Sequence, residues 1–106
     1  MAGLSGVWTP LARAIQQLLD EAHRAGIPAY VTSGVRTHAQ QRALYRRYLA
    51  GMNPYPVAPP GTSDHELGLA VDLWAGTDEA TDQLGRAGVR WGGAWSARDR
   101  VHFTVR

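Results

Sequence analysis

Two short segments of this chain, residues 68–73 and 101–105, carry the same alternation of apolar side chains with polar or small ones. A period of two is typical of a β-strand that is buried on one face only. The buried faces would hold Leu69, Val71 and Leu73 in the first segment, and Val101, Phe103 and Val105 in the second. The opposite faces then carry Asp72 and His102. If the two strands are antiparallel neighbours, these two side chains lie side by side on the same face of the sheet.

Two helical patterns precede these strands. Apolar residues at helical spacing predict a helix over about residues 10–25, with Pro10 in its first turn and Gly26 after its end. Thr37 and Gln40 fit a capping box, which predicts the start of a second helix that Gly51 ends. Its apolar stripe would be Leu44, Tyr45, Tyr48 and Leu49.

Shorter elements complete the pattern. Residues 27–33 predict a strand, with Pro28 at an edge or outside the ladder. An acidic segment over residues 77–85 predicts a third helix, capped by Thr77. Residues 51–62 hold four prolines and two glycines without any period, so we expect a loop that forms a rim or lid. This order of elements predicts an α+β fold: a small antiparallel β-sheet with two main helices on one side and a cleft on the other.

Length and composition favour a single-domain protein without a membrane span or a nucleic-acid partner. A chain of 106 residues predicts one domain, residues 1–106, with one core. No apolar run approaches the roughly 18 residues of a membrane span, and the first residues show no signal peptide. All 11 basic residues are arginines and the net charge is +2. Because these arginines are scattered, we expect no nucleic-acid partner. The cluster of Arg42, Arg46 and Arg47 is interpreted as a solvated helix face.

The chemistry-bearing residues gather at the two strand segments. His65, Asp72 and His102 make up two histidines and a carboxylate, which is the ligand set of a catalytic zinc site with one open position. The chain has no cysteine, so any zinc must be held by nitrogen and oxygen. Asp99, three residues before His102, fits a base for the zinc-bound water. The alternatives are a structural role for the three residues without metal, and a turn in which Asp99 pairs with Arg98 or Arg100.

The residues resemble a known family, the zinc D-alanyl-D-alanine carboxypeptidases and L-alanyl-D-glutamate endopeptidases, which cut bacterial peptidoglycan stem peptides and include many phage endolysins. The resemblance rests on a Ser-x-His-x-x-Gly-x-Ala-x-Asp motif and a late Asp-x-x-His element, complete here as Ser63, His65, Gly68, Ala70, Asp72, Asp99 and His102. Residues 33–37 with Gln40 resemble the family's Ser-Gly-aromatic-Arg-Ser/Thr element, although Val35 replaces the aromatic residue. The stretch from Trp91 to Trp95 is similar to the endopeptidase branch.

This resemblance implies one zinc ion held by His65, Asp72 and His102, in a cleft on the open side of the sheet. It implies that Asp99 is the general base and acid. Arg36 would bind a substrate carboxylate or stabilise the oxyanion, and both remain open. The alternative for Arg36 is a plain salt bridge that fixes the turn between strand and helix. Ser63 would bind substrate or a ligand. Gln40 is a helix cap or a site residue, and Trp91 and Trp95 belong to the core or to the cleft wall.

The function expected from the resemblance is zinc-dependent hydrolysis of peptidoglycan stem peptides, by a monomer that does not insert into membranes. The Trp91 to Trp95 stretch favours an L-alanyl-D-glutamate-type endopeptidase. The alternatives are a D-alanyl-D-alanine carboxypeptidase and a catalytically silent wall-binding or signalling module that keeps zinc for structure. Such a protein acts on the bacterial cell wall as a phage lysin released at lysis, a virion-associated lysin, or an excised domain of a longer protein.

Overall fold

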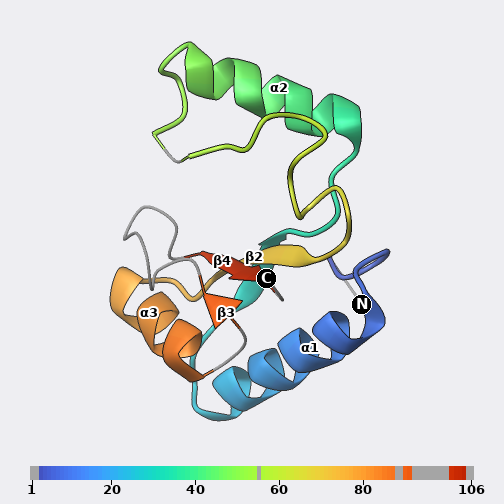
Figure 1. Ribbon diagram of the computed structural model, residues 1–106. Helices are drawn as coiled ribbons and strands as arrows, with labels where there is room; N and C mark the ends of the chain where they lie inside the picture. The colour runs from blue at the N-terminus through green and yellow to red at the C-terminus, as the bar shows by residue number, and fades with distance from the viewer. Residues whose placement is uncertain (1–2, 55, 88–89, 92–100, 105–106) are drawn as a thin grey trace.

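A computed structural model describes residues 3–54, 56–87, 90–91 and 101–104. Its elements follow the order α1 (Thr9–Arg24), β1 (Tyr30–Ser33), α2 (His38–Leu49), β2 (Ala70–Trp74), α3 (Asp78–Ala87), β3 (Arg90–Trp91) and β4 (His102–Thr104). The strands form one antiparallel sheet in the order β1-β2-β4-β3 (Figure 1). The predicted α+β class with a small antiparallel sheet is confirmed. None of the described helices has the length and apolar character needed to cross a membrane.

The helix α1 forms because one of its faces is apolar and its first turn accepts Pro10. All five apolar residues that predict it are buried: Leu11, Ile15, Leu18, Leu19 and Ala22. They pack against Val71 and Leu73 of β2 and Phe103 of β4 in one core cluster, which also includes Leu84 of α3. The alternation is therefore confirmed for Val71, Leu73 and Phe103, whereas Leu69 and Val101 are only partly buried and Val105 lies outside the described residues.

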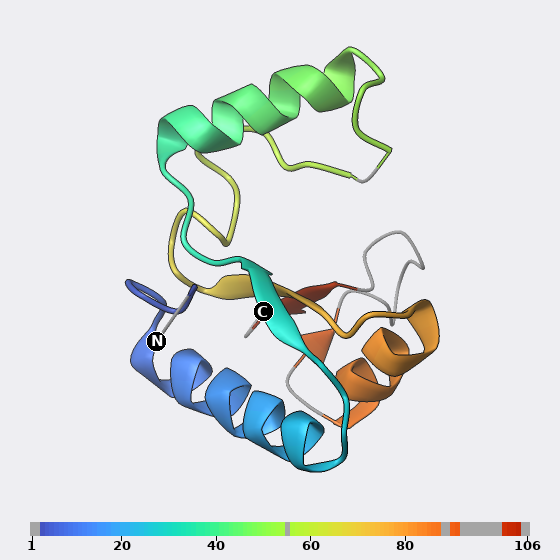
Figure 2. The ribbon, with the colours of Figure 1, turned by 180° about the vertical axis from the view of Figure 1, so that it is seen from behind.

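The two helices on the covered side of the sheet are α1 and α3, whereas the sequence predicts that the second long helix joins the first. Figures 1 and 2 show α1 and α3 on one side of the sheet and α2 well away from them on the other side. Of the α2 side chains only Gln41 is buried, and Leu49 of the predicted apolar stripe is 66% exposed. An apolar stripe shows which face of a helix is apolar, but it does not say which part of the protein covers that face.

The beginning of α2 is fixed as its sequence predicts. The Thr37 hydroxyl accepts a hydrogen bond from the Gln40 backbone N–H, and the Gln40 side chain accepts one from the Thr37 N–H. Thr77 likewise accepts a bond from the Ala80 N–H at the start of α3. The strand β1 is shorter than its predicted span of residues 27–33, because its pairing with β2 begins only at Tyr30. The two-residue strand β3 has no counterpart in the predicted elements.

Candidate metal centre and its cleft

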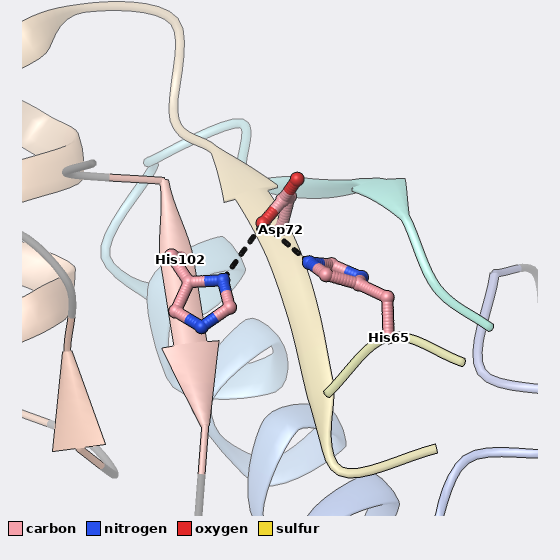
Figure 3. A group of neighbouring side chains, drawn as sticks. All are labelled: His65, Asp72 and His102. Carbon is pink, nitrogen blue, oxygen red and sulfur yellow. Dashed lines mark hydrogen bonds and ion pairs between the residues drawn. The ribbon is translucent and has the colours of Figure 1, made fainter. Parts of the chain in front are cut away.

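Three side chains from the turn before β2, from β2 and from β4 meet on the open face of the sheet. Asp72 of β2 lies directly opposite His102 of β4, as the alternation in both segments predicts. His65 comes from the turn before β2. Asp72 Oδ1 lies 3.1 Å from His65 Nε2 and 3.5 Å from His102 Nδ1 (Figure 3). The three residues therefore offer two imidazole nitrogens and one carboxylate oxygen within 4.8 Å of one another.

The orientation of His65 is set by its second ring nitrogen. Nδ1 lies 2.9 Å from the Gly34 carbonyl oxygen, which can only accept a hydrogen bond, so Nδ1 carries a proton. In the neutral ring Nε2 then presents a lone pair to the Asp72 carboxylate. Two lone pairs 3.1 Å apart need a proton or a cation between them. A histidine whose other nitrogen donates to a backbone carbonyl is typical of metal-ligating histidines.

The spacing of Asp72 Oδ1 from each histidine nitrogen is close to the spacing of ligand atoms around a tetrahedral zinc ion. Zinc binds nitrogen and oxygen at about 2.0–2.2 Å, which separates two neighbouring ligand atoms by about 3.3–3.5 Å. The separations of 3.1 Å and 3.5 Å at Asp72 Oδ1 lie close to that range. If these three side chains hold a metal ion, the cleft beside them leaves room for a further ligand, as in catalytic zinc sites.

Arg36 fixes the other oxygen of Asp72. Its Nη2 lies 3.0 Å from Asp72 Oδ2, and both side chains are largely buried. Burial alone would raise the pKa of the Asp72 carboxyl group, but hydrogen bonds from His102 and His65, together with the charges of His65 and Arg36, hold that pKa well below its usual range. Asp72 is therefore a carboxylate at any pH near neutrality.

The motif residues around the triad have local roles. Ser63 is buried, and its hydroxyl accepts a hydrogen bond from the His65 N–H at 3.2 Å, which shapes the turn that carries this histidine. Gly68 adopts a φ of +73°, and a Cβ there would lie 2.7 Å from the Gly6 carbonyl oxygen. The sequence pattern places Gly68 in the strand beside Asp72. In the structure it belongs to the turn that packs against the segment before α1.

A cleft of about 370 Å³ opens beside the triad. Its lining consists of the triad, Arg36, Gln41, residues 56–58 and residues 62–64. The described part of the predicted loop, 51–54 and 56–62, contains no helix or strand. Pro56, Val57 and Ala58 form part of the cleft wall, so this loop is a rim of the site.

Several residues predicted from the sequence are not placed here. Asp99, Trp95, Arg98 and Arg100 lie outside the described residues, and of Trp91 only the backbone in β3 is described. Gln40 is a capping residue, whereas its neighbour Gln41 lines the cleft. The sequence does contain a signal for Gln41: it is a polar residue on the helix face of Leu44, Tyr45 and Tyr48, at positions i+3, i+4 and i+7.

Fold and site together define a small α+β protein with a candidate His–Asp–His metal site that lines a cleft. The model of the VanY family, described as D-alanyl-D-alanine carboxypeptidase, matches residues 6–99. The chain belongs to this family. A D-alanyl-D-alanine carboxypeptidase of Enterococcus faecalis is 32% identical to it, over 73% of this chain and 32% of the relative. The chain thus spans about a third of the length of that curated relative.

Solved structures show the same likeness. The L-Ala D-Glu endopeptidase ChiX of Serratia marcescens is 28% identical, with a TM-score of 0.74 over 98% of this chain and 84% of that one. A vancomycin resistance D,D-pentapeptidase VanY, solved with Zn(II), is 25% identical, with a TM-score of 0.69 over 94% of this chain and 73% of that one. VanYB in complex with D-Ala-D-Ala is 25% identical with a TM-score of 0.71, over 92% of this chain and 70% of that one.

Proposed function

We propose that this chain is a zinc peptidase that hydrolyses peptide bonds in the stem peptides of bacterial peptidoglycan. The observation that carries the proposal is the convergence of His65, Asp72 and His102 within 4.8 Å beside an open cleft. Membership of the VanY family and the Zn(II) in a solved relative support the identity of the ion. The peptidase activities named for the relatives support the class of substrate.

A zinc ion held by the three ligands would lower the pKa of a bound water to about 7 and polarise a carbonyl group as a Lewis acid. Asp99 is proposed as the general base that takes the proton from the attacking water and delivers it to the leaving amine. Its position in the sequence, three residues before His102, supports this role. Ser63 is proposed to contact the substrate from the cleft wall, which it lines.

Arg36 is proposed to stabilise the developing oxyanion or to bind the substrate. Three of its five N–H donors are used within the protein, by Ser33, Gln41 and Asp72. Among the described residues no partner is found for the second hydrogens of Nη1 and Nη2, and we propose that they bind a substrate oxygen. Donors aimed at a developing oxyanion are among the largest contributors to catalysis.

The charge of Arg36 helps to distinguish an endopeptidase from a carboxypeptidase. A carboxypeptidase must bind the terminal carboxylate of its substrate, and among the described cleft residues Arg36 is the one permanently charged cation. Its charge is already matched by Asp72 at 3.0 Å. This pairing favours an endopeptidase, which needs no cation for a chain terminus, and cleavage between L-alanine and the following D-residue is our first choice. The likeness to ChiX supports the same choice.

A carboxypeptidase that releases D-alanine is the second candidate, since the matching family model carries that description. A catalytically silent wall-binding or signalling module is the third. The open cleft beside the triad counts against it, because a structural zinc site is usually closed by a fourth protein ligand. In each case we propose that the protein acts at the bacterial cell wall, as a phage lysin, a virion-associated lysin, or the excised domain of a longer protein.

Digestion of purified peptidoglycan, with mass spectrometry of the newly formed termini, separates these candidates. The endopeptidase produces a new amino terminus inside the stem peptide and leaves the terminal D-alanine in place. Synthetic stem peptides with a free or an amidated C-terminus sharpen the comparison, because an endopeptidase should cleave both. Release of free D-alanine alone, from the free-acid peptide only, would replace our first choice with the carboxypeptidase. Binding without any cleavage would favour the silent module.

A further inference from the structure

Gln41 is the one buried side chain of α2, with no exposed surface, and it is polar. The remainder of this helix stands apart from the core cluster formed by α1, α3 and the sheet. A buried amide needs partners for its donor and acceptor groups, or it costs free energy on folding. The hydrogen-bond partners of Gln41 therefore indicate the role of this side chain.

Both ends of the Gln41 amide have partners. Its Oε1 accepts a hydrogen bond from Arg36 Nη1 at 3.1 Å, and its Nε2 donates one to the Ala58 carbonyl oxygen at 2.8 Å. A guanidinium only donates and a carbonyl only accepts, so this orientation of the amide is the one that satisfies both. The side chain thus links Arg36 to the rim loop at Ala58.

Arg36 connects Gln41 to the candidate metal centre through a second hydrogen bond, to Asp72. Its Nε donates to Ser33 Oγ at 3.0 Å and its Nη2 to Asp72 Oδ2 at 3.0 Å. With Gln41 on Nη1, the planar guanidinium has a partner on each of its three nitrogens, which fixes its position and rotation. Because Oδ2 of Asp72 is bound to Arg36, Oδ1 is the oxygen that faces His65 and His102.

We infer that Gln41 is a positioning residue, which holds Arg36 in the orientation that presents Asp72 Oδ1 to the two histidines and ties this arrangement to the cleft rim at Ala58. These hydrogen bonds are present in the structure whatever the protein does. Their effect on metal affinity and substrate binding rests on the function proposed above. Partners that orient a metal ligand typically change metal affinity by about 10–100-fold when they are removed.

Two substitutions separate the two bonds. Gln41→Met keeps an unbranched side chain of similar length and removes both hydrogen bonds. Gln41→Glu keeps an acceptor for Arg36 but cannot donate to the Ala58 carbonyl. Gln40→Ala is the matched control, because it removes a neighbouring glutamine that caps the same helix and whose side chain bonds to Thr37. All three variants are expected to lower the melting temperature, so stability alone does not decide.

The first readout uses the metal-free protein. We expect the Arg36 Nε–H signal in ¹⁵N NMR spectra to be protected from solvent exchange in the parent, in Gln40→Ala and in Gln41→Glu. In Gln41→Met it should exchange faster. An unchanged exchange rate in a folded Gln41→Met variant would overturn the inference. This readout does not depend on the proposed function.

The second readout is zinc affinity, measured by competition with a chelator. Gln41→Met should bind zinc about tenfold more weakly than the parent, at the low end of the range for such partners, since it acts on Asp72 through Arg36. Gln41→Glu and Gln40→Ala should stay close to the parent. With stem peptide as substrate, both Gln41 variants should raise KM because the rim link is lost. Parental zinc affinity in Gln41→Met would contradict the inference, whereas a parent that neither binds zinc nor cleaves would contradict the proposed function instead.

Discussion

Asp72 connects the groups of the candidate site, since its two carboxylate oxygens contact different partners. Oδ1 faces the two histidines and Oδ2 receives Arg36. The sequence predicts that Asp72 and His102 are neighbours because alternation fixes which side chains share a strand face. It does not reveal that Gln41 reaches Arg36, since that contact depends on the path of the chain between α2 and the rim loop. Asp99 stays a prediction because it lies outside the described residues.

The depressed pKa of Asp72 predicts a dependence of stability on pH in the metal-free protein. A carboxylate with a lowered folded-state pKa stabilises the fold above its unfolded pKa of about 3.9, and this contribution is lost as the pH falls toward the folded pKa. Asp72→Asn should therefore lower the free energy of unfolding at pH 7 by about 1.5–3 kcal/mol, the range for hydrogen bonds to charged groups. Urea titrations should show a smaller difference at pH 3. A difference that grows on acidification would contradict this account.

Asp99→Asn tests the proposed proton transfer. Asparagine keeps the shape of the side chain but cannot accept the proton at neutral pH. General acid–base assistance is typically worth about 10²–10⁴ in rate, so turnover should fall by that order while zinc content and melting temperature stay near the parent values. Steady-state kinetics with metal analysis of the same samples measure this. Near-parental turnover would exclude the role, and loss of zinc would show that Asp99 is itself a ligand.

The sequence predicts the individual helices and strands better than it predicts how they are arranged around the sheet. Caps, glycines and apolar spacing are local signals, and they place α1, α2 and α3 within a few residues of the observed bounds. The position of α2 depends on what covers its apolar stripe, which no local signal contains. The strand β3 has only two residues, too few for an alternation to be visible. The turn before β2 is likewise set by contact with a distant segment.

Gly68→Ala tests that turn. An alanine in this left-handed backbone conformation destabilises the fold by about 1–2 kcal/mol. Its Cβ would also lie 2.7 Å from the Gly6 carbonyl oxygen. Gly26→Ala is the matched control, because Gly26 has a similar φ of +80° and no atom within 4 Å of the added Cβ. Gly68→Ala should therefore lower the free energy of unfolding more than Gly26→Ala does, and should weaken zinc binding by moving His65. Equal losses in the two variants would show that the close approach to Gly6 costs nothing.

At the scale of the whole molecule, the sheet separates the packed core from the candidate site. Core side chains of α1, α3 and the strands fill one side of the sheet. The triad, Gln41 of α2 and residues 56–58 of the rim loop line the cleft. Figures 1 and 2 show α2 on the side of the sheet opposite α1 and α3. Asp72 and His102 stand on strands that are packed from behind, so the spacing of these two candidate ligands is set by the rigid part of the fold, as an exact metal geometry requires.

The central claim is that His65, Asp72 and His102 hold a zinc ion on which peptidoglycan cleavage depends. The most direct measurement is the release of soluble fragments from purified peptidoglycan by tag-free protein, with the zinc content of each sample determined in parallel. We expect about one zinc per chain, loss of cleavage on chelation, recovery on adding zinc, and neither zinc nor cleavage in His102→Ala. His38→Ala, which removes an exposed histidine outside the triad, should keep both. Full cleavage by a verified metal-free sample would contradict the account.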